Sequence, residues 1–316
     1  MKAYVTDAGK VRWALPDPVA WRLEYTAGVP CDSFWIRCVW DENNTTKPEE
    51  WVGFTAEHGG SRVFTGVVDE CEVSVSKEGR LLEVSGRGMA ALLLDNEALG
   101  QDYLTATQED IVRDHVHPYG ISVAGGAALR AVSQFSVSTG SSEWSVVYDF
   151  ARYYGGIMPR FDREGRLVLI GWDDKTERRI DDSTPLISLV RRDKRYGVLS
   201  QVLMRDRWSG VVETLTNKEF AAAGGRARRI ITMPERSNYK DMRYSGKFQL
   251  DKSASQWKRM EVTVAQAFCV WPGELVSVSR SGLDWNGRYR AVEVTVGMDT
   301  GGCWSRIELA PPDFTI

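Results

Sequence analysis

Short segments in which apolar and polar residues alternate make up both ends of this 316-residue chain. In the first 100 residues they are 21–25, 33–40, 62–68, 71–75 and 81–85. Clusters of Gly, Pro, Asn and Asp separate them, and segment 41–50 is too polar to be buried. Because successive residues of a strand face opposite sides, this spacing predicts an antiparallel β-barrel or sandwich with an exposed loop at 41–50.

After residue 184 the same pattern returns. Its segments are 186–190, 198–204, 208–215, 228–233, 261–264, 275–279, 289–296 and 305–309. Both ends share an order of features: a Trp-x-Gly motif, a strand, a Gly-containing turn and a second strand. The motif stands at 51–53 and 271–273, and the second strand at 64–68 and 289–293. This weak internal repeat indicates two related β domains.

The segment between these regions has a different pattern. Apolar residues recur at helical spacing over 143–155, with two serines before them and a Gly155-Gly156 pair after them. Serine is a good N-cap and glycine a good helix terminator, so a helix is predicted there. Residues 157–161, a polar turn at 162–165 and residues 167–171 then predict a hairpin, with its polar tip exposed and facing a neighbouring subunit.

A second helix is predicted to end near His115, with Thr107 and Asp110 as its N-terminal capping pair. It leads through Tyr119-Gly120 into a strand at 121–123. Both helices are followed by Tyr-Gly and a strand, so we expect two helices on one small sheet. The whole chain is predicted to have a β-rich α+β fold, with β domains at 1–100 and 185–316 flanking a small α/β domain at 101–184.

The composition supports packed cores, because 43% of the residues are hydrophobic. A formal net charge of −3 argues against a surface that generally binds polyanions, so no specific nucleic-acid binding is expected. Local exceptions are the basic clusters at 191–195 and 226–229. No apolar run is long enough to cross a bilayer, and the first 13 residues lack the features of a signal peptide.

Five cysteines are scattered through the chain without a CxxC pair, which favours reduced thiols and folding in a cytoplasm.

Asp114, His115 and His117 form the one sequence cluster with metal or acid-base potential. The two histidines are not at the i, i+4 spacing that places two ligands on one helix face, and a proline follows them. His58 lies in a Glu-His-Gly-Gly turn and is predicted to be a solvated loop residue. We therefore predict no metal site and no cofactor.

Other catalytic patterns are missing from the sequence. There is no GxSxG, GxxxxGK[ST] or HExxH motif. The pairs Asp173-Asp174 and Asp181-Asp182 stand near predicted turns, where carboxylates usually cap or are hydrated. Gly86-Arg87-Gly88 follows a strand but lacks the third glycine of a dinucleotide fingerprint, so it predicts a strand-to-helix turn without a ligand. We predict that the chain is not an enzyme and has no catalytic residues.

Tryptophan is abundant, with 12 copies. Tryptophans on a β scaffold can stack on sugars, which leaves a carbohydrate-binding module as an alternative. More often they supply core and subunit-interface area, and we favour this use. A cell-wall hydrolase built from carboxylates on distant strands is a further alternative.

Three stretches resemble the baseplate hub proteins of Mu-like and T-even phage tails and of contractile injection systems. They are 85–95, with its Ser-Gly-Arg-Gly start; the helix, Tyr-Gly-Gly and hairpin unit ending at 167; and 272–276 with 287–292. Where the family often has Asp after Gly-Arg, this chain has Gly88.

The resemblance implies two tail-tube-like antiparallel β-barrel domains flanking the α/β domain, and a homotrimer that joins a hexameric tail tube to a trimeric central spike. Baseplate wedge proteins and the tape measure protein are further partners that it implies. It places the chain in a virion or tail-like particle assembled in a bacterial cytoplasm, and it carries no fixed interface residues.

Overall fold

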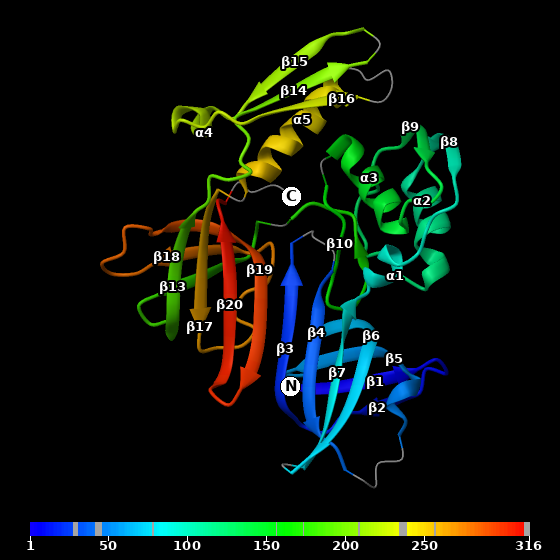
Figure 1. Cartoon of the computed structure of the whole chain (residues 1–316), viewed down its shortest axis with the longest axis vertical. Coiled ribbons are helices and arrows are strands. Elements are labelled where there is room, and N and C mark those ends of the chain that lie inside the picture. The colour runs from blue at the N-terminus through cyan, green and yellow to red at the C-terminus, as the bar shows by residue number, and fades with distance from the viewer. Residues whose placement is uncertain are drawn as a thin grey trace.

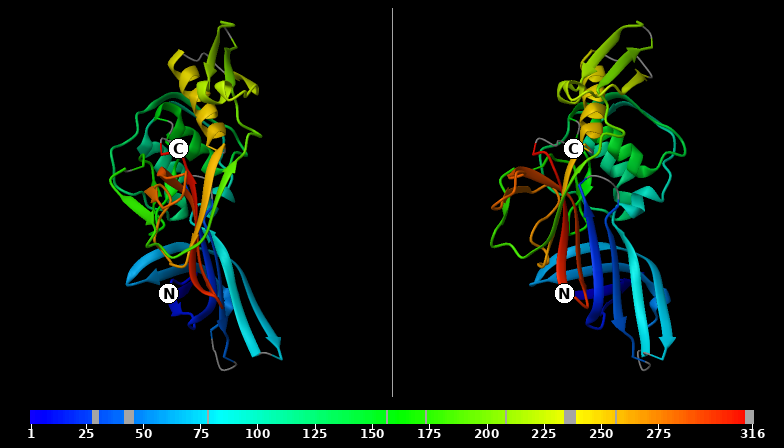
Figure 2. Two further views of the ribbon diagram at one scale, coloured as in Figure 1. Left: turned by 90° about the vertical axis from the view of Figure 1, so that its left-hand side faces the viewer. Right: turned by 60° about the vertical axis from the view of Figure 1, so that its left-hand side comes forward.

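The computed structural model describes residues 1–27, 31–41, 46–77, 79–155, 157–172, 174–207, 209–233, 239–255 and 257–312, without the side chains of 153–155, 233 and 239–245. It is an elongated molecule with the N-terminal β region at one end (Figures 1 and 2). The other three parts are a second β region, a helical unit beside it, and a small three-stranded unit at the opposite end.

One sheet of thirteen strands runs through both β regions. Its main path is β13 (Leu186–Asp193), β17 (Lys258–Val264), β20 (Gly302–Ala310), β19 (Gly287–Asp299), β3 (Pro18–Thr26), β4 (Ser33–Val39), β7 (Gly79–Gly88), β6 (Ser61–Ser76), β5 (Trp51–His58), β1 (Lys2–Asp7) and β2 (Arg12–Ala14). β18 (Leu275–Ser279) also pairs with β19, and β12 (Glu177–Asp181) pairs with β18. All these pairs are antiparallel except β12 with β18. The β-rich class and the large antiparallel sheet predicted from the sequence are therefore confirmed.

The two β regions share one order of strand pairing, although β1 pairs antiparallel with β5 and its counterpart β12 pairs parallel with β18. In the first, the pairing order is β1-β5-β6-β7-β4-β3. In the second it is β12-β18-β19-β20-β17-β13. Taken in chain order, β1, β3, β4, β5, β6 and β7 thus correspond to β12, β13, β17, β18, β19 and β20. The internal repeat seen in the sequence is a repeat of topology, and β3 of the first copy pairs with β19 of the second.

The sheet does not close into a barrel in the part of the chain that the structure describes. β13 pairs only with β17, and the half of β6 after residue 68 pairs only with β7. β2 and β12 are further edge strands, each paired on one side among the described strands. Where the resemblance implies barrel domains, the described residues thus form one open sheet.

A single core joins the two β regions, because the buried residues of both repeats contact one another. Phe34 and Phe54 stack with ring centroids 3.7 Å apart, and Phe64 meets both rings at steep angles. Val294, Val296 and Ile307 bury the equivalent face of the second repeat. Burial of this face follows from the apolar alternation seen in the sequence.

The helical unit contains α1 (Ala91–Leu94), α2 (Gln108–His115), a 3-10 turn η2 (His117–Tyr119) and α3 (Glu143–Gly155). The capping box of Thr107 and Asp110 on α2 is present, and Ser142 accepts a hydrogen bond from the backbone of Ser145 at the start of α3. Both predicted helices are confirmed. The predicted single sheet is found only in part: β10 (Arg160–Phe161) pairs with β11 (Leu167–Val168), while β8 (Gln101–Ala106) pairs with β9 (Val132–Val137) in a separate sheet. Segment 121–123 contributes one bridge, from Val123 to Leu167.

A second α/β unit is inserted between β13 and β17. It holds β14 (Gln201–Asp206), β15 (Val212–Thr216), β16 (Arg228–Met233), α4 (Lys218–Ala222) and α5 (Tyr239–Ala254). α5 packs on β14 and β15, where Gly246 approaches Leu215 and Met204. Neither helix was predicted, because the polar sequence of α5 carries no clear apolar stripe.

All five cysteines are free thiols. Among the described helices, none combines the length and the apolar character that crossing a membrane requires.

Candidate functional site

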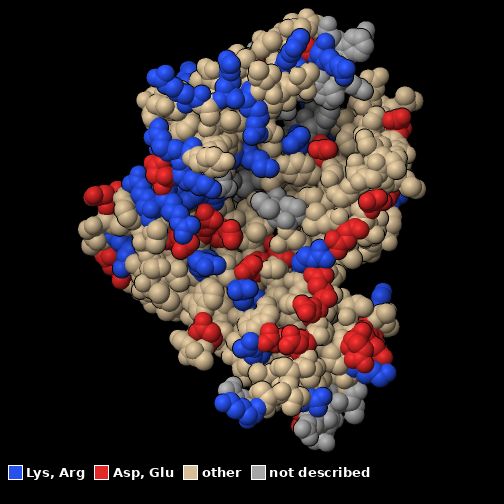
Figure 3. All heavy atoms as spheres, viewed as in Figure 1, with Lys and Arg blue, Asp and Glu red and all other residues tan. Residues whose placement is uncertain are grey.

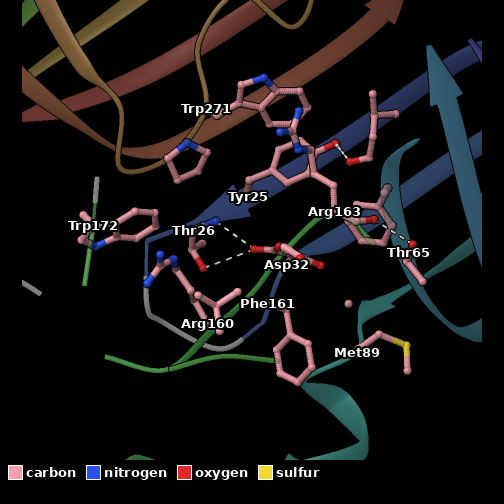
Figure 4. Close-up of a pocket in the computed structure, with 16 residues that line it drawn as sticks. Tyr25, Thr26, Asp32, Thr65, Met89, Arg160, Phe161, Arg163, Trp172 and Trp271 are labelled. Atoms are coloured by element: carbon pink, nitrogen blue, oxygen red, sulfur yellow. Dashed lines mark hydrogen bonds between the residues drawn. The ribbon is translucent and has the colours of Figure 1, made fainter. Parts of the chain in front are cut away.

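A cavity of about 200 Å³ lies where the two β regions and the helical unit meet (Figure 4). The first β region contributes Tyr25 and Asp32 to its wall, the hairpin β10–β11 contributes Arg160 and Arg163, and the second β region contributes Trp271. The cavity therefore marks the contact between three parts of the chain that are far apart in sequence.

Asp32 is a half-buried carboxylate in the wall of this cavity. Its Oδ1 accepts a hydrogen bond of 2.9 Å from the backbone N–H of Thr26. Loss of water around the carboxylate raises the pKa of Asp32 to about 7, although the hydrogen bonds from Thr26 favour the ionised form. Nearby, the Tyr25 hydroxyl donates to the carbonyl of Val63, and burial raises the pKa of Tyr25 well above its usual range.

Two arginines of the hairpin stack on tryptophan rings. The guanidinium of Arg160 lies 3.8 Å from the ring centroid of Trp172, and that of Arg163 lies 4.3 Å from the ring centroid of Trp271. Arg160 also donates to the carbonyl of Ile170 at 2.6 Å, and burial lowers its pKa to about 10. Such cation–π contacts strengthen when water is excluded, so they hold the hairpin against the second β region.

The hairpin tip packs within its own chain. The hydroxyl of Thr65 donates to the carbonyl of Arg163 at 2.8 Å, and Gly165 lies buried against Thr65 and Met89. Arg163 and Glu164 remain exposed, so only part of the predicted exposed turn faces solvent. The hairpin predicted from the sequence thus contacts the first β region through Thr65 and the second through Trp271.

The stability of the junction should depend on pH through Asp32. An acid whose pKa is higher in the folded than in the unfolded state stabilises the fold below its unfolded pKa, and this contribution is lost as pH rises through the folded pKa. We expect the free energy of unfolding to fall by about 1–2 kcal/mol between pH 4 and pH 8, relative to the Asp32→Asn variant. Denaturant melts of both proteins at several pH values measure this difference; parallel pH profiles would contradict it.

Of the histidine cluster, His115 belongs to a buried polar network. His115 Nδ1 lies 2.6 Å from Glu143 Oε2, and His115 Nε2 lies 3.1 Å from the hydroxyl of Tyr103. Tyr103 donates to Asp114, and Tyr119 donates to Glu143 at 2.9 Å. The contact between His115 on α2 and Glu143 on α3 joins the two helices. Each buried polar group of this network has a partner, as buried polar groups require.

The other sequence candidates lie apart from this network. His117 starts η2 and is exposed, and His58 is exposed with its ring 4.8 Å from that of Phe268. Within the described residues, no three His, Cys, Asp or Glu side chains gather in a way that could hold a metal ion. Sequence reasoning missed Glu143 as the partner of His115, because the two residues are 28 positions apart.

The carboxylate pairs make turn and ion-pair contacts. Asp181 accepts hydrogen bonds from Ser183, and Asp182 from Ser281. Asp174 accepts from the guanidinium of Arg290 at 2.7 Å, and Asp173 lies outside the described residues. These contacts account for the three described carboxylates of the two pairs as turn and ion-pair residues.

Gly86-Arg87-Gly88 closes β7 and leads into α1, as the predicted strand-to-helix turn requires. Arg87 binds Asp69 and Asp95 in two bidentate contacts of 2.7–2.9 Å. A Cβ at position 86 would lie 2.0 Å from the carbonyl of Val67, so this glycine permits close strand packing.

The tryptophans serve packing. Five of them are buried, and the other six that the structure describes are half-buried; Trp208 lies outside the described residues. A sugar-stacking surface needs exposed rings, and none of the described tryptophans is exposed. The buried five are Trp21, Trp40, Trp51, Trp144 and Trp257.

The sheet carries a charged face opposite its core. On β3, Arg22 and Glu24 alternate with buried residues, and on β4 and β7 Arg37 and Glu83 form an ion pair of 2.6 Å. On β20, Arg306 is exposed between two buried neighbours. In the view of Figure 3 basic residues gather over the inserted unit and the adjoining part of the second β region, and residues of both signs are mixed over the rest of this face.

Neither a protein-family model nor a curated protein matches this sequence. Solved structures match its fold. A tail protein from Neisseria meningitidis aligns over 99% of this chain and 96% of its own, with a TM-score of 0.81 and 15% identity. The 43 kDa tail protein of prophage MuSo2 from Shewanella oneidensis aligns over 100% and 99%, with a TM-score of 0.81 and 17% identity.

A third match is the E. coli c3393 protein, a type VI secretion component with structural similarity to the T4 tail proteins gp27 and gp5. It aligns over 93% of this chain and 73% of its own, with a TM-score of 0.58 and 13% identity. The chain thus has the fold of phage tail proteins. Within that class, it shares the fold of a Mu-type prophage tail protein over its whole length, and the resemblance inferred from the sequence is confirmed at the level of fold.

Proposed function

We propose that this chain is the structural baseplate hub of a phage tail or tail-like particle. It acts as a homotrimeric symmetry adaptor between a hexameric tail tube and a trimeric central spike. The observation that carries the proposal is the continuous sheet through two topologically equivalent repeats, with one apolar face and one charged face. The fold shared with tail proteins supports the same role.

The symmetry argument follows from the repeat. Three copies of a chain with two similar β domains present six similar units in a ring, while the whole ring keeps threefold symmetry. The sixfold face fits tube subunits and the threefold face fits a spike. Tape measure and wedge proteins would contact the inside and outside of such a ring.

In this proposal the barrel closes only on assembly. The open edges at β13 and at the second half of β6 would meet between copies, and the charged face of the sheet would line a water-filled passage. Exposed edges are usually protected in proteins that remain monomers. We propose tube-like β domains at 1–100 and 185–316, with the α/β domain 101–184 bracing them, and no enzymatic activity.

The mass of the purified chain tests the proposal. We expect analytical ultracentrifugation to show a trimer at micromolar concentration, and electron microscopy of particles to place it at the tail base. A chain that stays monomeric at every concentration and never joins tails would refute the hub role.

A further inference from the structure

The two repeats correspond residue by residue at the strands that matter for assembly. β6 has a bulge between Val68 and Glu70, and β19 has one between Ala291 and Glu293. After the bulge both strands run for the same length, to a turn that pairs Ser76 with Gly79 and Asp299 with Gly302. Glu70 is therefore the counterpart of Glu293, and Glu72 that of Thr295.

β3 and β13 correspond in the same way. Each has a bulge one residue after its start, between Pro18 and Ala20 in β3 and between Leu186 and Ser188 in β13. Trp21 and Leu189 then face the equivalent buried residues of β4 and β17. Counting on from these residues makes Arg192 the counterpart of Glu24, and Lys194 that of Thr26.

Within the chain the repeats meet through β3 and β19. Thr26 lies opposite Glu293, Glu24 lies opposite Thr295, and Trp21 lies opposite Met298. The equivalent edges, β13 and the second half of β6, remain unpaired among the described strands. A contact of the same kind can therefore form only between two copies.

If β13 of one copy pairs with the second half of β6 of another in the register of β3 with β19, opposite charges lie together. Lys194 falls opposite Glu70, Arg192 falls opposite Glu72, and Leu189 falls opposite Val75, whose side chain is 75% exposed. All four charged residues are exposed. Arg192 has an ion pair of 3.2 Å with Glu261 of its own chain, and neither glutamate has an ion pair with the described residues. The register came from topology alone, so this charge match is an independent observation.

The strand directions also agree. Every step along the sheet from β13 to β6 is antiparallel, so the two edge strands run in opposite directions and would pair as an antiparallel ladder after rotation of a second copy. We infer that the second half of β6 in one copy pairs with β13 of the next copy, with Glu70 beside Lys194 and Glu72 beside Arg192. This inference rests on the proposed ring and supplies its intersubunit contact.

Cysteine cross-linking tests the register. Ser74 and Val190 are the counterparts of Gly297 and Arg22, which lie opposite each other. We expect oxidation of the S74C/V190C variant, purified in a chain whose Cys31, Cys71, Cys269 and Cys303 are replaced by serine, to give a covalent trimer on non-reducing gels. The single variants and the parent chain in the same background should stay as single chains, because the contact joins different edges.

The outcomes separate the two proposals. If the wild type is trimeric by ultracentrifugation and the double variant forms no cross-link, the strand pairing is wrong and the hub proposal stands. Cross-linking by a single variant also overturns the pairing, because it requires a symmetric contact. A chain that is monomeric and never cross-links contradicts both proposals.

Charge exchange gives a second test that does not depend on oxidation. We expect Lys194→Glu to weaken self-association by about tenfold or more, since each contact gains a repulsive pair. Adding Glu70→Lys should restore it to within a few-fold of wild type. Arg130→Glu makes the same charge change on an exposed loop and should have no effect. Failure of the second substitution to rescue would contradict the pairing.

Discussion

Replacement of Glu143 by alanine is expected to destabilise the chain by about 3 kcal/mol or more. The carboxylate accepts from the Tyr119 hydroxyl and contacts His115 Nδ1, and both His115 and Glu143 are buried. Its loss leaves a buried imidazole without its partner and removes the polar link between α2 and α3. Denaturant unfolding of the purified chain measures the change.

The control for this prediction is Glu109→Ala. Glu109 lies in the first turn of α2 and is exposed, so its removal should cost no more than about 0.5 kcal/mol. Glu143→Gln, which keeps hydrogen-bonding atoms at this position, should fall between the two. Equal effects of Glu143→Ala and Glu109→Ala would mean that the network contributes nothing specific.

Gly86→Ala is expected to have a similarly large effect, a loss of roughly 3 kcal/mol. The added methyl group would lie 2.0 Å from the carbonyl oxygen of Val67 and 2.7 Å from the ring of Phe34. The carbonyl belongs to β6, which is fixed by its ladder with β7, so it cannot move without loss of hydrogen bonds. A thermal or denaturant melt measures the loss.

Gly125 is the matched control. A Cβ there meets no atom within 4 Å, and the residue is exposed in a loop. Gly125→Ala should change stability by less than about 1 kcal/mol, with a small gain from reduced freedom of the unfolded chain. If Gly86→Ala were equally mild, the two strands would have to separate at little cost.

Local features of this protein were predictable from the sequence. The capping box at Thr107 and Asp110 and the alternation in β7 depend on residues three or fewer positions apart. Such signals act through backbone geometry, which neighbouring residues determine. The inserted unit was harder, because α5 is largely polar and owes its place to packing on β14 and β15.

The candidate sites depended on contacts between distant residues. Asp32 was not singled out, because an aspartate in a loop is ordinary until Tyr25, Arg160 and Trp271 enclose it. His115 was singled out for its neighbours in sequence, yet its partner is Glu143. The spacing of residue types along the sequence does not predict such pairs, because each pair forms only when separate elements pack together.

The sequence by itself determined many of the strands and turns and the helices α2 and α3, and it carried the repeat of two β regions; it did not predict α5, the longest helix. Only the tertiary structure decided that the repeats share one open sheet, joined through β3 and β19, with β13 and the second half of β6 among its unpaired edges. Strand formation needs a local alternation of residues. The choice of neighbouring strand depends on the burial of faces and on the ladder hydrogen bonds between segments more than 200 residues apart.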